Sequence, residues 1–165
     1  MKYILIIFLL VGLNSCSNTN RNTEALQQKI DSLEAQIANA YTPGFGEFMS
    51  NIQAHHSKLW FAGKNRNWKL ADFEVHEIME SVEDIKKYQQ DRPESKEIGM
   101  IEPVLDSVNF AIQKQDTLLF KKSYTLLTNT CNKCHSIVNF EFNVVKIPDT
   151  QPFSNQTFKL VKQEL

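Results

Sequence analysis

Apolar residues recur every three or four positions over most of residues 45–138, with polar and charged residues between them. This period predicts amphipathic helices, here over about 45–62, 68–89, 102–114 and 116–138. Asn67 and Asp116 stand where a helix N-cap is expected, and Pro103 suits a first helical turn. Because the connections between these segments are short, the sequence predicts an all-α fold built on an antiparallel four-helix bundle over 45–138.

A further amphipathic helix is predicted over residues 23–41. Its apolar positions alternate spacings of four and three, which is typical of a coiled coil: Leu26, Ile30, Leu33 and Ile37. The segment is shorter than the three to four heptads, roughly, that identify a coiled coil from sequence alone. Two arrangements therefore fit it, self-association into a homo-oligomer and packing against the chain's own main domain. The polar residues 16–22 predict a flexible tether ahead of the helix.

The pattern changes again after residue 138. Phe140, Phe142 and Val144 alternate with polar residues, and Pro148 and Pro152 follow them. Alternation and prolines are typical of extended chain rather than of helix. Residues 139–165 are therefore expected to form an extended tail that lies on the bundle.

The first 15 residues have the pattern of a signal peptide. Lys2 precedes an apolar run over residues 4–13, which is too short to span a bilayer as a stable helix. The next letters, LNSC at residues 13–16, resemble the lipobox of bacterial lipoproteins. That resemblance implies cleavage before Cys16 and a diacylglycerol on its sulfur. The mature chain is then a lipoprotein anchored to a membrane of the cell envelope and facing the periplasm. A plain secretory signal with an incidental cysteine is the alternative.

Net charge and cysteine count restrict the possible functions further. The formal net charge of -1 gives no indication of a nucleic-acid partner. The chain has 3 cysteines, too few for the disulfide scaffold of a small exported protein. With Cys16 assigned to lipid, the other two fall within one short motif.

That motif, CNKCH at residues 131–135, matches the attachment sequence of a c-type haem. Cys131 and Cys134 share a helix face, so their thiols can add to the two vinyl groups of haem. The adjacent His135 then presents its imidazole to the iron as the proximal ligand. The sequence therefore predicts one covalently bound haem c. A redox Cys-x-x-Cys pair is disfavoured because no βαβ pattern surrounds it, and a structural zinc site because no second ligand pair is free.

The order of the helices restricts the ligand on the other side of the iron. In an antiparallel bundle the end of the last helix lies beside the start of the first. Met49 stands early in the first helix, on its inward stripe, and is the first distal candidate. His56, about two turns later, is the second. Met49 also suits ordinary core packing, which would leave the distal side open.

The arrangement resembles the cytochrome c-prime and cytochrome c-556 family, in which a haem-attachment motif lies near the end of the last helix of a four-helix bundle. The resemblance covers residues 45–138 and is carried by Cys131, Cys134 and His135. It implies that a first-helix position faces the haem, and that this position is methionine in six-coordinate members, as Met49 would be here. The Cys16 anchor, the 23–41 helix and the tail depart from the soluble members of the family.

A second likeness covers HSKLWFAG at residues 56–63, then NW at 67–68 and LADFE at 70–74, which resemble uncharacterised bacterial proteins with an H-x-K-L-W-x-A-G segment. Some of those proteins look as though they share a later C-N-x-C-H motif. The likeness raises His56, Trp60, Trp68 and Glu74 as candidates for a role beyond packing. Burial of the two tryptophan rings at a helix turn is the simpler explanation.

Three functions are consistent with these motifs. Axial ligation by His135 and Met49 predicts a membrane-tethered electron carrier that serves a redox partner protein in the cell envelope. An open distal site predicts instead a sensor or scavenger of NO or CO. Without haem, His55, His56 and His76 would hold zinc or copper in a metal-binding lipoprotein. No nucleophile stands at motif spacing from a base, so the sequence does not indicate an enzyme.

Overall fold

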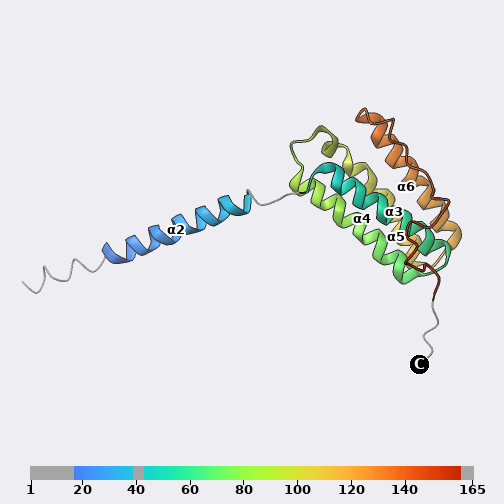
Figure 1. Ribbon diagram of the computed structural model, residues 1–165, viewed down its shortest axis with the longest axis horizontal. Helices are drawn as coiled ribbons and strands as arrows, with labels where there is room; N and C mark the ends of the chain where they lie inside the picture. The colour runs from blue at the N-terminus through green and yellow to red at the C-terminus, as the bar shows by residue number, and fades with distance from the viewer. Residues whose placement is uncertain (1–16, 39–42, 161–165) are drawn as a thin grey trace, which may run out of the picture. The chain divides into compact units, whose positions relative to one another are not determined.

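The computed structural model describes residues 17–38 and 43–160, which belong to two units. These residues contain five α-helices and no strand, which confirms the all-α fold class. The described residues of one unit form helix α2 (Ser17–Ala38). The other contains α3 (Phe45–Lys64), α4 (Trp68–Tyr88), α5 (Glu102–Gln113) and α6 (Thr117–Ile137), as Figure 1 shows. No helix in the described ranges has the length and apolar character needed to cross a membrane.

Helix α2 begins earlier than the sequence pattern indicates. It starts at Ser17, so residues 17–22, expected to form a flexible tether, belong to the helix. No glycine or proline interrupts this stretch, and the polar residues in it lower helix propensity only modestly. Cys16, the expected signal peptide and residues 39–42 and 161–165 lie outside the described residues.

The helix starts of the second unit follow the predicted capping residues. Asn67 Oδ1 accepts a hydrogen bond from the Leu70 amide at the start of α4, and Asp116 Oδ1 accepts two amide hydrogen bonds at the start of α6. Pro103 lies in the first turn of α5. The polar turn expected at 91–96 is partly helical: the 3-10 helices η2 (Pro93–Lys96) and η3 (Ile98–Ile101) lead into α5.

The four helices of the second unit pack around one core. Each of α3 to α6 contacts the next along the chain, and α6 also contacts α3. Their inward stripes supply the fully buried side chains, which include Leu59, Val75, Ile78, Ile85, Leu105, Val108, Phe120 and Leu127. Figure 1 shows α6 diverging from α3 toward its C-terminal end. Helix η3 contacts α4, α5 and α6, so the short connection before α5 is part of the packed unit.

A close approach between the end of α3 and the start of α6 accounts for several residues of the 56–63 segment. The Phe120 ring lies against Gly63, where an added Cβ would be 2.2 Å from Phe120 Cζ. Trp60 and Trp68 surround the same ring, with centroid distances of 6.3 and 6.1 Å. Both tryptophans therefore have a packing role.

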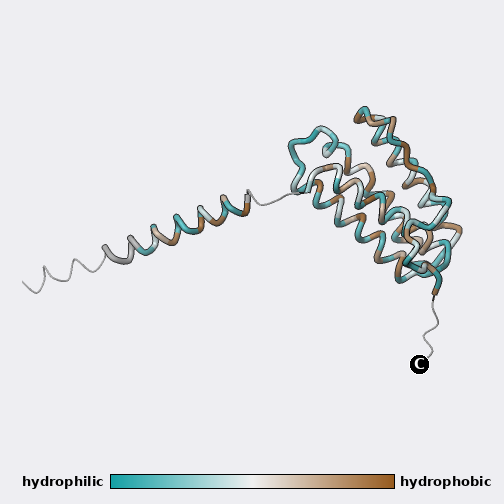
Figure 2. Tube along the Cα trace, viewed as in Figure 1, coloured by the Kyte–Doolittle hydropathy of each residue, from teal (hydrophilic) through white to brown (hydrophobic). Residues whose placement is uncertain are grey.

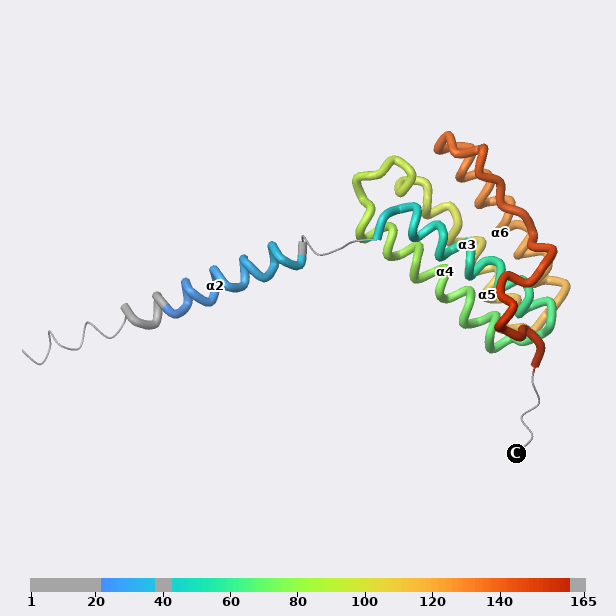
Figure 3. Tube along the Cα trace, viewed as in Figure 1, coloured from blue at the N-terminus to red at the C-terminus, as the bar shows by residue number. Residues whose placement is uncertain are grey.

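The chain after α6 forms a tail without helix or strand up to residue 160. It runs back along α6, as the red trace beside the orange helix shows in Figure 3. Phe158 is fully buried, with its ring centroid 5.7 Å from that of Phe61. Ile147 also packs against the core. The tail thus lies on the helices as expected, and Phe158 and Ile147 make the contact. Phe142 and Val144, in contrast, are 77% and 72% exposed.

Candidate cofactor site

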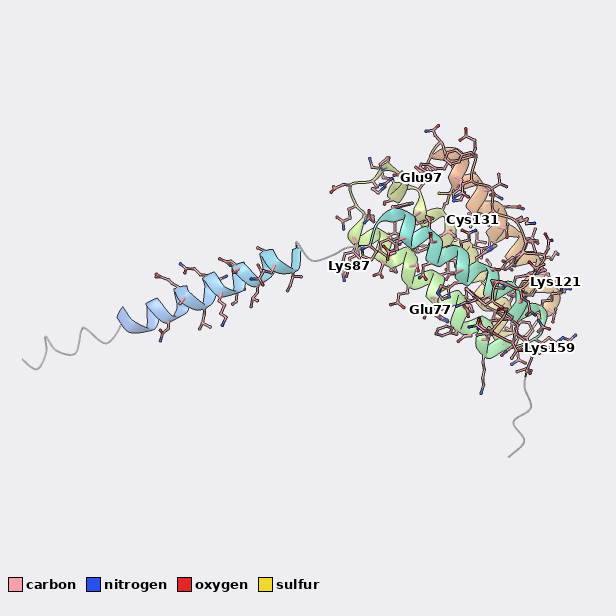
Figure 4. The ribbon with its side chains drawn as sticks, in the orientation of Figure 1. Glu77, Lys87, Glu97, Lys121, Cys131 and Lys159 are labelled. Carbon is pink, nitrogen blue, oxygen red and sulfur yellow. The ribbon has the colours of Figure 1, made fainter. Side chains whose placement is uncertain are left out.

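A cavity of about 410 Å³ opens between the first half of α3 and the last turns of α6. Cys131, Cys134 and His135 line it from α6, and Met49 and His56 line it from α3. Residues of η2 and η3 form a third wall, and residues of the tail form a fourth. Figure 4 labels Cys131 on α6 and Glu97 on the connection between α4 and α5. The structure therefore brings together all five residues that the sequence singled out for the haem site.

The two cysteines face the cavity from one side of α6, because residues three apart nearly complete a helical turn. Burial raises the pKa of the Cys131 thiol to about 12 and also raises the pKa of Cys134. Redox-active cysteine pairs have lowered thiol pKa values instead. The environment of these thiols is therefore unlike that of a thiol–disulfide redox pair.

His135 is held by the tail. Its Nδ1 lies 2.6 Å from the backbone oxygen of Asn143. A carbonyl oxygen only accepts hydrogen bonds, so Nδ1 donates, and in the neutral ring Nε2 then keeps the lone pair that a metal needs. Metal-binding histidines are commonly fixed in this way, by a carbonyl or carboxylate at the other ring nitrogen. The tail therefore sets both the orientation and the tautomer of the proximal candidate.

Asn132, inside the motif, provides a second attachment of the tail. Its Nδ2 donates to the backbone oxygen of Val145 at 2.8 Å, and its Oδ1 accepts from the Val145 amide at 2.7 Å. The side chain thus pairs with both backbone groups of one residue, as a neighbouring strand would. Together with the bond from His135 to Asn143, this contact keeps residues 143–145 on the cavity wall.

Replacing Asn132 by alanine is expected to release this part of the tail. Both backbone groups of Val145 lose their partner, which costs about 1–3 kcal/mol where they stay half-buried. Hydrogen exchange at the Val145 amide should accelerate, and limited proteolysis should cut the chain between residues 139 and 147. Lys133→Ala is the matched control because that side chain is exposed on the same helical turn. Equal protection of Val145 in the two variants would show that Asn132 does not hold the tail.

His56 lines the cavity but both of its ring nitrogens have partners. Nδ1 lies 2.9 Å from Tyr124 Oη and Nε2 lies 3.0 Å from Thr128 Oγ1. Tyr124 Oη donates its hydroxyl proton to the His56 carbonyl, and Thr128 Oγ1 donates its proton to the Tyr124 carbonyl, so the protonated ring nitrogen of His56 donates to one of these two hydroxyl oxygens. Burial lowers the pKa of His56 to about 4, which keeps the ring neutral at pH 7. To bind iron, Nε2 would have to give up the Thr128 hydroxyl.

Met49 has no such competing bond. It lies about two turns before His56 on the same side of α3 and is half-buried in the cavity wall. Within the described residues no hydrogen bond to its sulfur is formed. A thioether is an established axial ligand of haem iron. Met49 is therefore the better-placed of the two distal candidates.

Three further lining residues were not singled out by the sequence pattern: Arg92, Glu94 and Met100. Arg92 and Glu94 form a two-point ion pair, with Nη2 2.7 Å from Oε1 and Nε 3.2 Å from Oε2. Hydrogen bonds from Arg92 hold the pKa of Glu94 below its usual range, although this carboxylate is only 7% exposed. Only the turn signal of Pro93 marked this region, and a local turn signal carries no information about contacts with α3 and α6, which are distant in sequence.

The remaining histidines do not join the site or each other. His55 Nδ1 lies 2.6 Å from Glu74 Oε2, in a buried pair between α3 and α4. Burial raises the pKa of Glu74, and the hydrogen bond from His55 opposes that shift. His76 lies at the surface, where its Nδ1 is 2.7 Å from the backbone oxygen of Asp72. The described ranges contain no group of three or more His, Cys, Asp or Glu side chains that could hold a metal ion. The zinc or copper site proposed for His55, His56 and His76 is therefore not formed.

Comparisons with protein-family models, with curated proteins and with solved structures find no match for this chain.

Proposed function

We propose that the chain is a membrane-anchored c-type cytochrome with one haem, acting in electron transfer in the cell envelope. One observation carries this proposal: Cys131, Cys134 and His135 line a single cavity whose opposite wall contains Met49. The cavity volume of about 410 Å³ falls within the range of ligand pockets, which is roughly 300–1,000 Å³. Helices α3 to α6 are interpreted as the antiparallel four-helix bundle, and Cys16 as the site of the lipid anchor.

Each of the cavity residues would bind a different part of the haem. The Cys131 and Cys134 thiols would form the covalent links, and His135 would offer Nε2 from a ring fixed by Asn143. Met49 would supply the sulfur on the other side. Bound haem c supplies a one-electron iron couple, whose potential is raised by histidine–methionine ligation.

Arg92 has the chemistry to receive the carboxylates that haem carries. Its guanidinium has five N–H groups, of which Glu94 accepts from two nitrogens. The remaining donors are available at the cavity wall, and the Phe45 ring lies 5.2 Å below the guanidinium carbon. Glu94 and Phe45 thus orient Arg92, which we propose binds the haem propionates.

The experiment that tests the proposal is a haem assay on the whole chain. The chain is exported in bacteria together with a haem-maturation system, purified, denatured and assayed as the pyridine haemochrome. We expect one haem of c-type spectrum per chain that stays with the denatured protein. The Cys131→Ala, Cys134→Ala double variant should lose it, and Lys133→Ala, in the same motif, should keep it.

Two results would contradict the proposal. The first is a chain without covalent haem under conditions in which a control cytochrome matures. The second is retention of covalent haem by the double cysteine variant, because the described residues contain no other cysteine.

A further inference from the structure

Helix α2 carries an apolar stripe that no described residue of its unit covers. Leu26, Ile30, Leu33 and Ile37 are 62%, 46%, 48% and 74% exposed. The hydrophobic positions recur along α2 in Figure 2, separated by polar residues. Most of the stability of a protein helix comes from packing its apolar face, so a helix of this kind needs a partner.

The types of the apolar residues indicate what kind of partner covers the stripe. The spacing of four, three and four places Leu26 and Leu33 at the d positions of a heptad repeat, and Ile30 and Ile37 at the a positions. Isoleucine at a with leucine at d favours a parallel coiled coil of two strands over three or four. The helix has 22 residues, about three heptads, so it is long enough for a short coiled coil.

The charged residues beside the stripe agree with this register. With Ile30 at a, Lys29 occupies a g position and Glu34 the following e position. In a parallel pair of helices, these two positions face each other across the interface and form salt bridges. Within one helix, residues five apart do not face each other. Lys29 and Glu34 are both exposed, so each is available to a second helix.

We infer that α2 pairs with the α2 of a second copy of this chain, as a parallel two-stranded coiled coil. Two Lys29–Glu34 pairs then form, one on each side of the interface. The apolar stripe is buried between the helices, and the two anchored chains leave the interface in the same direction. This inference rests on α2 alone and is independent of the haem site.

The test exchanges the charges without touching the apolar stripe. Two versions of the full chain with different C-terminal tags are co-expressed, extracted in detergent and purified through one tag, and recovery of the other is measured. Wild-type chains should recover each other. Lys29→Glu alone, or Glu34→Lys alone, should reduce recovery about tenfold, because like charges then face across both sides of the interface.

Co-expression of Lys29→Glu with Glu34→Lys should restore recovery, because each position again faces an opposite charge. Gln28→Glu and Glu24→Lys are matched controls at positions outside the interface and should leave recovery unchanged. Wild-type chains that do not recover each other would overturn the inference, since α2 would then be covered within its own chain or by another protein. Recovery that is insensitive to the charge at 29 and 34 would also overturn it.

Discussion

Met49→Ala is expected to convert the haem-loaded protein from a six-coordinate, low-spin spectrum to a five-coordinate, high-spin one. Met49 lies on the cavity wall opposite His135, and no described residue forms a hydrogen bond to its sulfur. Alanine cannot reach the iron, and His56 is held by Tyr124 and Thr128. The variant should bind carbon monoxide at least about tenfold more tightly, because no internal ligand competes for the sixth position. Visible spectra of the ferric and ferrous forms, with a carbon monoxide titration, measure both effects.

His56→Gln and Met100→Leu are the controls for this experiment, since both side chains line the same cavity. Both variants should keep the low-spin spectrum. If His56→Gln becomes high-spin while Met49→Ala does not, then His56 is the distal ligand and the Thr128 hydrogen bond opens on haem binding. If the wild-type protein is itself high-spin, the distal side is open, and sensing or scavenging of NO or CO replaces electron transfer as the proposed function.

The regular helices could be predicted because their signals are local. The period of apolar residues located α3 to α6, and the Asn67 and Asp116 caps located two of the starts, because a cap bonds amides two or three residues away. The start of α2 at Ser17 was missed because polar residues without glycine or proline are compatible with both tether and helix. The 3-10 helices before α5 were missed because a short, single-turn element has no period to detect.

The α6 side of the cavity could be predicted for a related reason. Cys131, Cys134 and His135 are adjacent in sequence, so a helix alone is enough to place them together. The candidate on the other wall, Met49, followed from helix order, which requires only that the last helix end beside the start of the first. Both sets of residues line the cavity.

The hydrogen bonds that distinguish the candidates could not be predicted. His56 bonds to Tyr124 and Thr128, which are 68 and 72 residues away. Asn132 occupies a variable position of the motif and pairs with Val145 only because the tail turns back along α6. Such contacts depend on the tertiary path of the chain. A sequence pattern identifies a histidine as a candidate ligand but not the hydroxyls that already occupy its nitrogens.

Gly63→Ala is expected to cause the largest loss of stability of any glycine-to-alanine change in the described residues. The new Cβ would lie 2.2, 2.3 and 2.7 Å from three atoms of the Phe120 ring. That ring is fully buried against Trp60 and Trp68, so it has little room to move. Overpacking of this kind costs about 1–3 kcal/mol, occasionally more, and we expect the upper end here. The midpoint and slope of urea unfolding measure the loss.

Gly46→Ala is the matched control, because it also adds a methyl group to α3 but nothing lies within 4 Å of the new Cβ. It should be neutral or stabilise the protein by up to about 1 kcal/mol, as alanine does in a helix. A Phe120→Leu change should recover part of the Gly63→Ala loss, since the two residues are in contact and their effects are not additive. If Gly63→Ala unfolds at the same urea concentration as Gly46→Ala, the Phe120 ring moves freely and the packing explanation is wrong.

If the loss and its partial recovery are both observed, the glycine that ends the 56–63 segment is required by the close approach of α3 and α6. That approach also places Tyr124, one turn after Phe120, against His56 at the cavity.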